Sequence, residues 1–161
     1  MNVKKIGFRG GCHWCTEGVF SIVKGVININ QGWIASDIPY ESFSEAIIVE
    51  YESIEVDLDN LIKIHLHTHA CIFDHSMRGK YRSAVYAFNQ LDKDESRKVI
   101  MRYCADFDSP IVTKTLMFRA FKSSEERYQD YYQKNPEKPF CQTYISPKVN
   151  MLMKEFSNLT Q

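Results

Sequence analysis

The segment that decides the architecture is Lys4–Lys24, with the sequence KKIGFRGGCHWCTEGVFSIVK. Its first residues, Lys4–Phe8, predict a short strand, and the pair Gly10-Gly11 is a turn signal that ends this strand. Over residues 12–24 the apolar side chains recur at helical spacing. The segment therefore predicts a strand, a tight turn and a helix that begins at its first cysteine.

The same alternation of strands and helices continues to the end of the chain. Strands are predicted over residues 26–33, 46–51, 81–88 and 110–118, and helices over residues 57–69 and after the capping signals that start at residues 92, 123 and 146. This order predicts a two-layer α+β or α/β domain around one core. A chain of 161 residues has the length of one domain, which we expect to span residues 1–161.

The composition narrows the class of protein. The chain is 44% hydrophobic and 25% charged, with a formal net charge of zero, so we expect neither a nucleic acid nor an acidic membrane surface as a partner. No apolar run approaches the roughly 20 residues that cross a bilayer. The first residues lack the long apolar stretch of a signal peptide, and we therefore expect a cytoplasmic protein.

The cysteines do not form a regular framework. An odd number at irregular spacing does not predict a set of disulfides, and in a reducing compartment each thiol is reactive, metal-bound or simply buried. The five cysteines are Cys12, Cys15, Cys71, Cys104 and Cys141. We interpret Cys71 as incidental and Cys104 as a packing residue of a helix, which leaves the other three as candidates for chemistry.

Cys12 has the position of a reactive thiol. A cysteine at the start of a helix lies beside free backbone N–H groups at the positive end of the helix dipole, and this setting stabilises the nucleophilic thiolate. The glycines before Cys12 would let a substrate approach the backbone closely. The alternative is a small buried residue in a tight turn, and position alone does not decide between the two.

Cys12 and Cys15 form a Cys-x-x-Cys motif, for which three interpretations stay open. The motif could be a thioredoxin-like redox pair, half of a zinc site, or one reactive cysteine with a neighbour one turn further on. Further zinc ligands could come from the cluster His65, His67, His69 and Cys71. The spacing of this cluster is not that of a finger-like site, so we predict no metal.

Four motifs, in the same order along the chain, resemble the peptide methionine sulfoxide reductase A family. The first is Gly10-Gly11-Cys12-His13-Trp14-Cys15-Thr16-Glu17, similar to that family's Gly-Gly-Cys-Phe-Trp-Cys-x-Glu. The others are the strand Ser44–Tyr51, the segment Gly79–Tyr86 with its Tyr-Arg-Ser, and Tyr131–Pro136 with its Lys-Asn-Pro. The resemblance covers most of the chain and implies a ferredoxin-like α+β domain in which helices pack against a mixed sheet.

The resemblance also implies roles for individual residues. Cys12 matches the nucleophile, and Glu45 matches the acid that protonates the sulfoxide oxygen. Tyr81 matches a tyrosine that hydrogen-bonds this oxygen, and Trp14 matches the aromatic wall that holds the substrate methyl group. A carboxylic acid suits its assigned place because the oxygen cannot leave without a proton.

The chain departs from the family at several positions near the substrate. His13 replaces a phenylalanine and makes the aromatic wall more polar. Ser76 stands where the family has an aspartate, whose hydrogen bond is lost or passes to Asp74. The loop between Trp33 and Glu45 is shorter than in the family, and Tyr40 is a candidate for the tyrosine that the family has in this loop. Phe140 stands where the family often has a tyrosine. These departures predict a divergent branch of the family.

The predicted activity is thiol-dependent reduction of methionine S-sulfoxide, free or in oxidised proteins, as a repair of oxidative damage without metal or organic cofactor. Cys12 becomes a sulfenic acid, Cys15 or Cys141 condenses with it to a disulfide, and thioredoxin or a similar dithiol reduces that disulfide. The resemblance places a recycling cysteine at either position. We favour Cys141 because a disulfide within the first helical turn would distort that turn.

Two other functions stay open. The first is a general disulfide oxidoreductase that uses Cys12 and Cys15 as its redox pair. The second is a zinc-binding interaction module built from these two cysteines and the cluster from His65 to Cys71.

Overall fold

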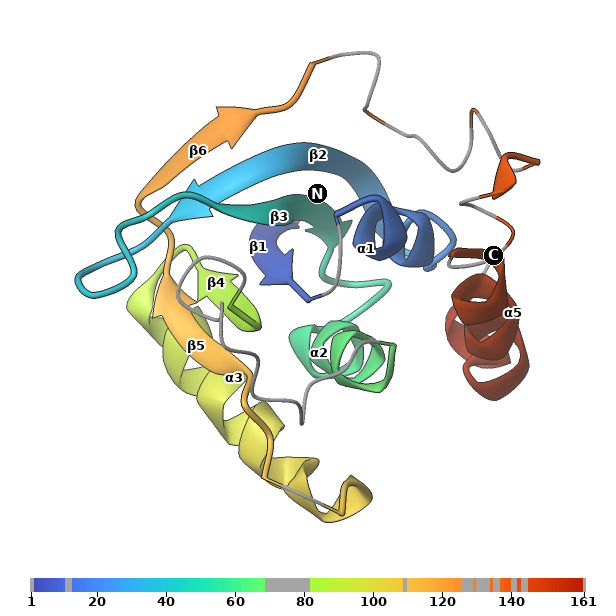
Figure 1. Ribbon diagram of the computed structural model, residues 1–161. Coiled ribbons are helices and arrows are strands. Elements are labelled where there is room, and N and C mark those ends of the chain that lie inside the picture. The colour runs from blue at the N-terminus through green and yellow to red at the C-terminus, as the bar shows by residue number, and fades with distance from the viewer. Residues whose placement is uncertain are drawn as a thin grey trace.

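Six strands form one sheet in the computed structural model, which describes residues 2–10, 13–68, 82–108, 110–125, 129, 134, 137–139, 142 and 145–160 (Figure 1). They are β1 (Val3–Arg9), β2 (Val26–Ala35), β3 (Ser44–Glu52), β4 (Ala84–Ala87), β5 (Lys114–Met117) and β6 (Ala120–Ser123), in the spatial order β5-β4-β1-β3-β2-β6. All neighbouring strands are antiparallel except β4 and β5, which are parallel. The predicted mixed sheet is confirmed.

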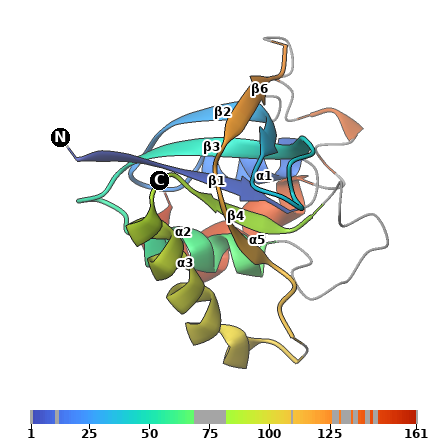
Figure 2. The same ribbon diagram turned by 90° about the vertical axis from the view of Figure 1, so that its left-hand side faces the viewer.

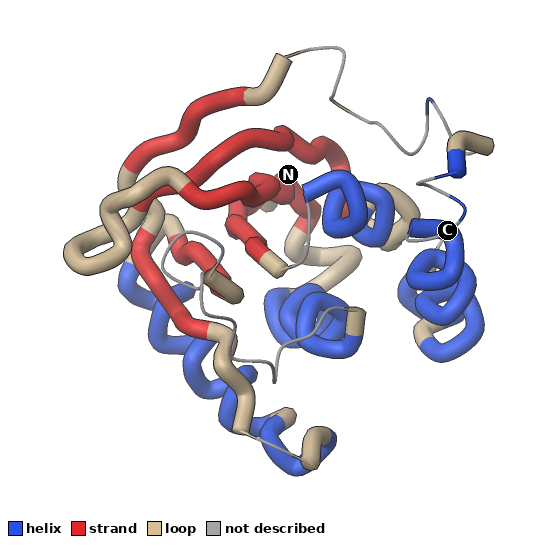
Figure 3. The backbone as a smooth tube through the Cα atoms, in the orientation of Figure 1, coloured by secondary structure: helices blue, strands red, loops and turns tan. Residues whose placement is uncertain are grey.

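Helices cover one face of this sheet and give the predicted two-layer α+β arrangement (Figure 2, Figure 3). They are α1 (His13–Phe20), α2 (Leu58–His67), α3 (Gln90–Arg102) and α5 (Ser146–Glu155), with 3₁₀ turns at Cys104–Asp106 and Ser157–Leu159. Ile47 and Val49 point from β3 into this layer and join Phe20, Leu61 and Leu152 in the main core. Burial of these apolar side chains drives the packing of helices on the sheet. Among the described helices, none combines the length and apolar character that crossing a membrane requires.

Three helix ends differ from the predictions. α1 ends at Phe20 rather than at residue 24, and the chain then turns through Gly25, whose φ of 88° suits glycine. The N-cap of α3 is Asn89 rather than Asp92, because the Asn89 side chain accepts a hydrogen bond of 2.8 Å from the Asp92 N–H. The N-cap position of α5 is Ile145, so the helix begins one residue after it.

The predicted helix start at Ser123 is wrong. Ala120–Ser123 forms strand β6, which pairs with β2 over Gly32–Ala35. The N–H of Ser124 then donates a hydrogen bond of 3.0 Å to the carbonyl oxygen of Gln31. Pairing with β2 therefore overrides the local signal of a capping box.

Candidate active site

The predicted strand, turn and helix are present on both sides of the Cys12 position. β1 ends at Arg9, Gly10 is buried in the following bend, and α1 begins at His13. The hydroxyl of Thr16 donates a hydrogen bond of 2.8 Å to the carbonyl oxygen of Gly10, which fastens the first turn of the helix to the end of the strand. Cys12 lies outside the described residues and directly precedes α1 in the sequence.

Glu45 lies near the same turn, on the face of the sheet that the helices cover. It is the second residue of β3, pairs with Trp33 of β2, and is half-buried. Because side chains alternate along a strand, Glu45 points to the same face as the core residue Ile47. Ile47 pairs with Phe8 near the end of β1, so the start of β3, with Glu45, lies at the end of the sheet where β1 turns toward α1. The carboxyl group therefore neighbours the turn that precedes α1.

Tyr40 lies on the other face of the sheet, against the buried side chain of Arg82. The Arg82 guanidinium donates to the carbonyl oxygens of Tyr40 and Ser42 at 3.0 and 2.8 Å, and to the Tyr86 hydroxyl at 2.9 Å. The centroid of the Tyr40 ring is 5.6 Å from Cζ of Arg82 and 5.6 Å from Nζ of Lys114. Both cations lie within the distance at which a cation attracts the face of an aromatic ring. A contact between Tyr40 and a substrate stays a prediction.

Comparison with known proteins assigns the family. A model described as peptide methionine sulfoxide reductase matches residues 4–160. The chain belongs to this family. Peptide methionine sulfoxide reductase MsrA of Sulfolobus acidocaldarius is 29% identical over 170 residues, which cover 97% of this chain and 96% of that protein. The protein of the same name from Chromobacterium violaceum is 28% identical and covers 99% of each chain. These matches confirm the predicted family. They also confirm the prediction that the chain is a thiol-dependent oxidoreductase.

Solved structures establish the same fold for this member of the reductase family. Mxr1 from Saccharomyces cerevisiae in reduced form superposes with a TM-score of 0.71 at 22% identity, over 88% of this chain and 91% of that chain. Methionine sulfoxide reductase A of Corynebacterium diphtheriae gives 0.69 at 19% identity, over 84% and 76%. Mxr1 in complex with Trx2 gives 0.62 at 22% identity, over 80% and 84%.

His65 and His67, the two members of the histidine cluster that the structure describes, contact neighbouring side chains of the fold. The His65 ring lies 4.7 Å from the ring of Phe8 and 6.4 Å from that of Phe20. Nε2 of His67 lies 3.1 Å from a carboxylate oxygen of Asp106. Within the described residues, no three His, Cys, Asp or Glu side chains are grouped to hold a metal ion. The other cluster members of the zinc interpretation lie outside the described residues.

The structure brings together only part of the predicted site. Glu45 is close to the start of α1, and Cys15, the third residue of that helix, is buried with 6% exposure. His13 and Trp14 contribute the backbone of its first turn. The predicted site residues Cys12, Ser76, Tyr81, Phe140 and Cys141 lie outside the described residues. The chemical roles of all these residues stay predictions.

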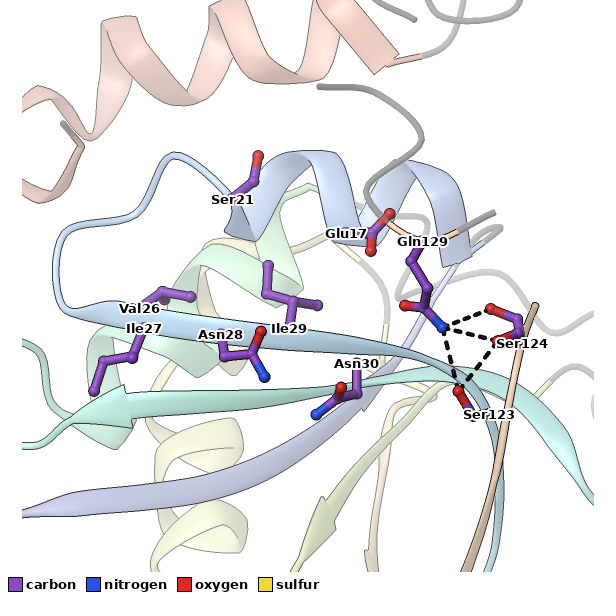
Figure 4. Close-up of a pocket in the computed structure, with 10 residues that line it drawn as sticks. All are labelled: Glu17, Ser21, Val26, Ile27, Asn28, Ile29, Asn30, Ser123, Ser124 and Gln129. Atoms are coloured by element: carbon purple, nitrogen blue, oxygen red, sulfur yellow. Dashed lines mark hydrogen bonds between the residues drawn. The ribbon is translucent and has the colours of Figure 1, made fainter. Parts of the chain in front are cut away.

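Two buried polar groups were not predicted from the sequence, one on each face of the sheet. Arg82 is one, and its signal was its place directly after a tyrosine in the Tyr-Arg-Ser motif. The other includes Glu17, which is 3% exposed and accepts a hydrogen bond of 3.1 Å from Gln31. Its signal was an acidic residue inside the first motif. A cleft of about 440 Å³ opens beside this second group (Figure 4). It is lined by Glu17, Ser21, Val26, Ile27, Asn28, Ile29, Asn30, Ser123, Ser124 and Gln129.

Proposed function

We propose that this reductase acts on methionine S-sulfoxide, with Cys12 as the nucleophile and Glu45 as the proton donor. The observation that carries the proposal is the antiparallel pairing of β1 and β3, which puts Glu45, the second residue of β3, at the same end of the sheet as the turn that leads from β1 to α1. A thiol directly before a helix is close to its free N–H groups and its positive end, which favour the thiolate. In this proposal the nucleophile Cys12 and the acid Glu45 lie close to the same turn, the one between β1 and α1.

The reductase step balances as a transfer of two electrons. The thiolate of Cys12 attacks the sulfoxide sulfur, Glu45 gives its proton to the oxygen, and the S–O bond of the substrate breaks as the oxygen passes to the cysteine sulfur. The products are methionine, a sulfenic acid on Cys12 and the Glu45 carboxylate. The sulfoxide is reduced and the thiol is oxidised. Protonation is required because an unprotonated oxygen is a poor leaving group.

The remaining predicted residues complete the substrate site in this proposal. Trp14 forms the wall beside the substrate methyl group, with His13 as its more polar neighbour. Tyr81 donates a hydrogen bond to the sulfoxide oxygen. Ser76 and Phe140 form the rim of the site in this proposal. Tyr40, whose ring lies against Arg82 on the other face of the sheet, would have to reach the substrate around the end of β3.

In the recycling step, a second thiol attacks the sulfenic sulfur and water leaves, which gives a disulfide. We favour Cys141 as this thiol. Cys141 precedes Ile145 by four residues, Ile145 is fully buried at the start of α5, and α5 packs against α1. Four residues of extended chain reach at most about 14 Å from that anchor. Cys15, by contrast, is buried within α1, and a bridge to Cys12 would require this turn to distort.

Thioredoxin, or a similar dithiol, is the proposed reductant. Thiol–disulfide exchange returns two thiols to the reductase and leaves the dithiol oxidised. The complex of yeast Mxr1 with Trx2 supports this proposal by analogy. We further propose a single-domain enzyme over residues 1–161 that works in the cytoplasm, where it repairs free or protein-bound methionine sulfoxide under oxidative stress.

The test is an activity assay on the two separated sulfoxide epimers of methionine, with dithiothreitol as reductant. We expect turnover of the S epimer alone. Reduction of insulin disulfides without reduction of either epimer would identify a general disulfide oxidoreductase instead. Zinc that remains bound to protein purified without added metal, together with no activity, would identify the interaction module.

A further inference from the structure

One stretch of β2 has an open edge. β3 pairs with one side of this strand over Val26–Ile34, whereas β6 pairs with the other side only over Gly32–Ala35. The cleft of about 440 Å³ lies along the part of this second side that β6 leaves, because its lining includes the whole run of residues 26–30. Side chains of a strand alternate between two faces, so a lining of consecutive residues indicates that the cleft follows the backbone edge. Figure 4 shows this run of β2 beside Glu17 and Ser21 of α1.

The direction of the backbone groups along this edge follows from Gln31. Its N–H and C=O both point away from β3, because they bond to the side-chain amide of Gln129 at 2.9 and 2.8 Å. In an antiparallel ladder every second residue directs both groups to the same side, and the register of β2 with β3 is regular from Ile29 to Gln31. The N–H and C=O of Ile29 therefore point into the cleft. Among the described residues, none bonds to these two groups.

The amide of Gln129 shows which kind of group this edge accepts. Its Oε1 accepts a hydrogen bond from the N–H of Gln31, and its Nε2 donates one to the carbonyl oxygen of the same residue, as the backbone of an added strand would do. This one amide continues the ladder beyond β6, and Ile29 offers the next place in it. The register irregularity between Val26 and Asn28 ends the regular ladder there. The open edge is therefore short and suits a short extended segment.

The rest of the lining favours a ligand that is recognised by its backbone. Short hydroxyl and amide side chains predominate around the edge, namely Ser21, Asn28, Asn30, Ser123, Ser124 and Gln129. Such side chains form no deep apolar pocket that would select one side chain of a ligand, whereas a strand added to a sheet edge gains its affinity from main-chain hydrogen bonds. A reductase of protein-bound methionine sulfoxide meets this residue in many sequences, so a contact that is independent of sequence suits it.

We propose that the edge of β2 at Ile29 binds an extended segment of a polypeptide substrate, which adds to the sheet through hydrogen bonds with the N–H and C=O of Ile29. The inference rests on the proposed function, because the segment belongs to a protein that carries methionine sulfoxide. Trp33, which pairs with Glu45, follows Ile29 along β2 at about 13 Å. A polypeptide that spans this distance engages the edge and the proposed acid together, and it therefore binds more tightly than free methionine sulfoxide.

The first test measures hydrogen exchange of the Ile29 amide by NMR in full-length Cys12→Ser, which leaves the sulfoxide intact. The probe is a twelve-residue peptide of Ser and Thr with one methionine sulfoxide at its centre. We expect saturating peptide to slow this exchange about tenfold, the scale of one added hydrogen bond. The control is the amide of Thr115 on the opposite edge of the sheet. The Lys114 N–H bonds to the carbonyl oxygen of Ser83, so the N–H of Thr115 points outward from β5, and its exchange should not change.

The second test uses Ile29→Pro in the otherwise unchanged enzyme. Proline removes the outward N–H and is tolerated on a strand edge where that group serves no neighbouring strand. KM for the twelve-residue peptide should rise about tenfold at unchanged kcat, because binding common to ground and transition state is lost. Turnover of free methionine sulfoxide should not change, nor that of a tripeptide with methionine sulfoxide between two serines, which spans at most about 11 Å. Thr115→Pro is the matched control and should leave all three substrates unaffected.

Several outcomes overturn the inference. Equal exchange of the Ile29 amide with and without peptide shows that the peptide does not bind this edge, and this measurement decides alone if Ile29→Pro does not fold. Exchange that is already slow without peptide shows that another occupant holds the edge, a second copy if dilution speeds the exchange and a segment of the same chain if it does not. Failure of the wild-type protein to reduce the S epimer overturns the proposed function instead, while protection of the Ile29 amide still reports on the edge.

Discussion

Arg82 and Glu45 are charged residues on opposite faces of one sheet, and their surroundings differ. Arg82 is 1% exposed, and its guanidinium donates to the carbonyl oxygens of Tyr40 and Ser42 and to the Tyr86 hydroxyl. Glu45 is half-buried at the start of β3, beside the turn before α1. A buried charge is tolerated only when its hydrogen bonds are made, which commits Arg82 to structure. A carboxyl that solvent still reaches can exchange its proton with water and meet a substrate.

The hydroxyl of Tyr86 reinforces this contrast. Burial raises the pKa of Tyr86, and this effect is larger than the opposing effect of the neighbouring Arg82. The phenol therefore stays neutral at physiological pH while its oxygen accepts the hydrogen bond from Nε of Arg82 at 2.9 Å. The Arg82 side of the sheet thus keeps one protonation state, whereas the proposed chemistry on the Glu45 side requires a proton to move.

The largest expected effect lies on the Glu45 side of the sheet and comes from Cys12→Ser. A serine hydroxyl is a far weaker nucleophile than a thiolate, so sulfoxide reduction should be abolished. The assay on the S epimer with dithiothreitol measures it. Cys104→Ser is the control, and it should retain activity. The prediction that Cys104 packs within a helix is wrong, because Cys104 is exposed in the 3₁₀ turn that follows α3. Turnover by Cys12→Ser would contradict the assignment of the nucleophile.

Glu45→Gln should slow the reductase step by roughly 10²–10⁴-fold, the usual scale for general acid catalysis, with little loss of stability. Single-turnover formation of the sulfenic acid measures the rate. Glu50→Gln is a matched control on the same strand, because Glu50 lies an odd number of positions after Glu45 and therefore points to the other face. Sulfenic acid formation at the wild-type rate in Glu45→Gln would show that the proton comes from elsewhere.

Arg82→Met should act on stability rather than on chemistry. Several buried carbonyl oxygens lose their donor, and we expect the free energy of unfolding to fall by roughly 3 kcal/mol. Urea denaturation measures this loss, and first-turnover kinetics on the folded protein measure the chemistry. If Arg82→Met were as stable as the wild-type protein but inactive, Arg82 would have a catalytic role rather than a structural one.

The smallest expected effect concerns Asp37, in the loop that Arg82 holds. A hydrogen bond from Arg119, aided by its charge, keeps the pKa of Asp37 below its ordinary value of 3.8. Because the folded-state pKa is the lower one, the contribution to stability is present above pH 3.8 and is lost as the pH falls through the folded-state pKa. Arg119→Gln should raise the pKa of Asp37 toward 3.8, as an NMR titration of its carboxyl group would show. An unchanged titration would exclude this pairing in solution.

Local signals in the sequence determined most of the elements. Lys4–Phe8 and Ala46–Tyr51 lie inside observed strands, and Asp57 caps α2 by accepting a hydrogen bond of 2.8 Å from the Asn60 N–H. These signals succeed because apolar periodicity, turn residues and caps involve neighbours within a few positions. The family motifs likewise marked Cys12 and Glu45 as candidates, since a motif depends on residue order and not on contacts.

Only the tertiary structure decided which distant residues meet. Three contacts join segments far apart in the sequence. They are the pairing of β1 with β3, the pairing of Ala120–Ser123 with β2, and the burial of Arg82 under the loop before β3. The docking of Gln129 on Gln31 spans 98 positions. No local preference encodes such contacts, because each polar group takes whichever partner the packed sheet brings within hydrogen-bonding distance.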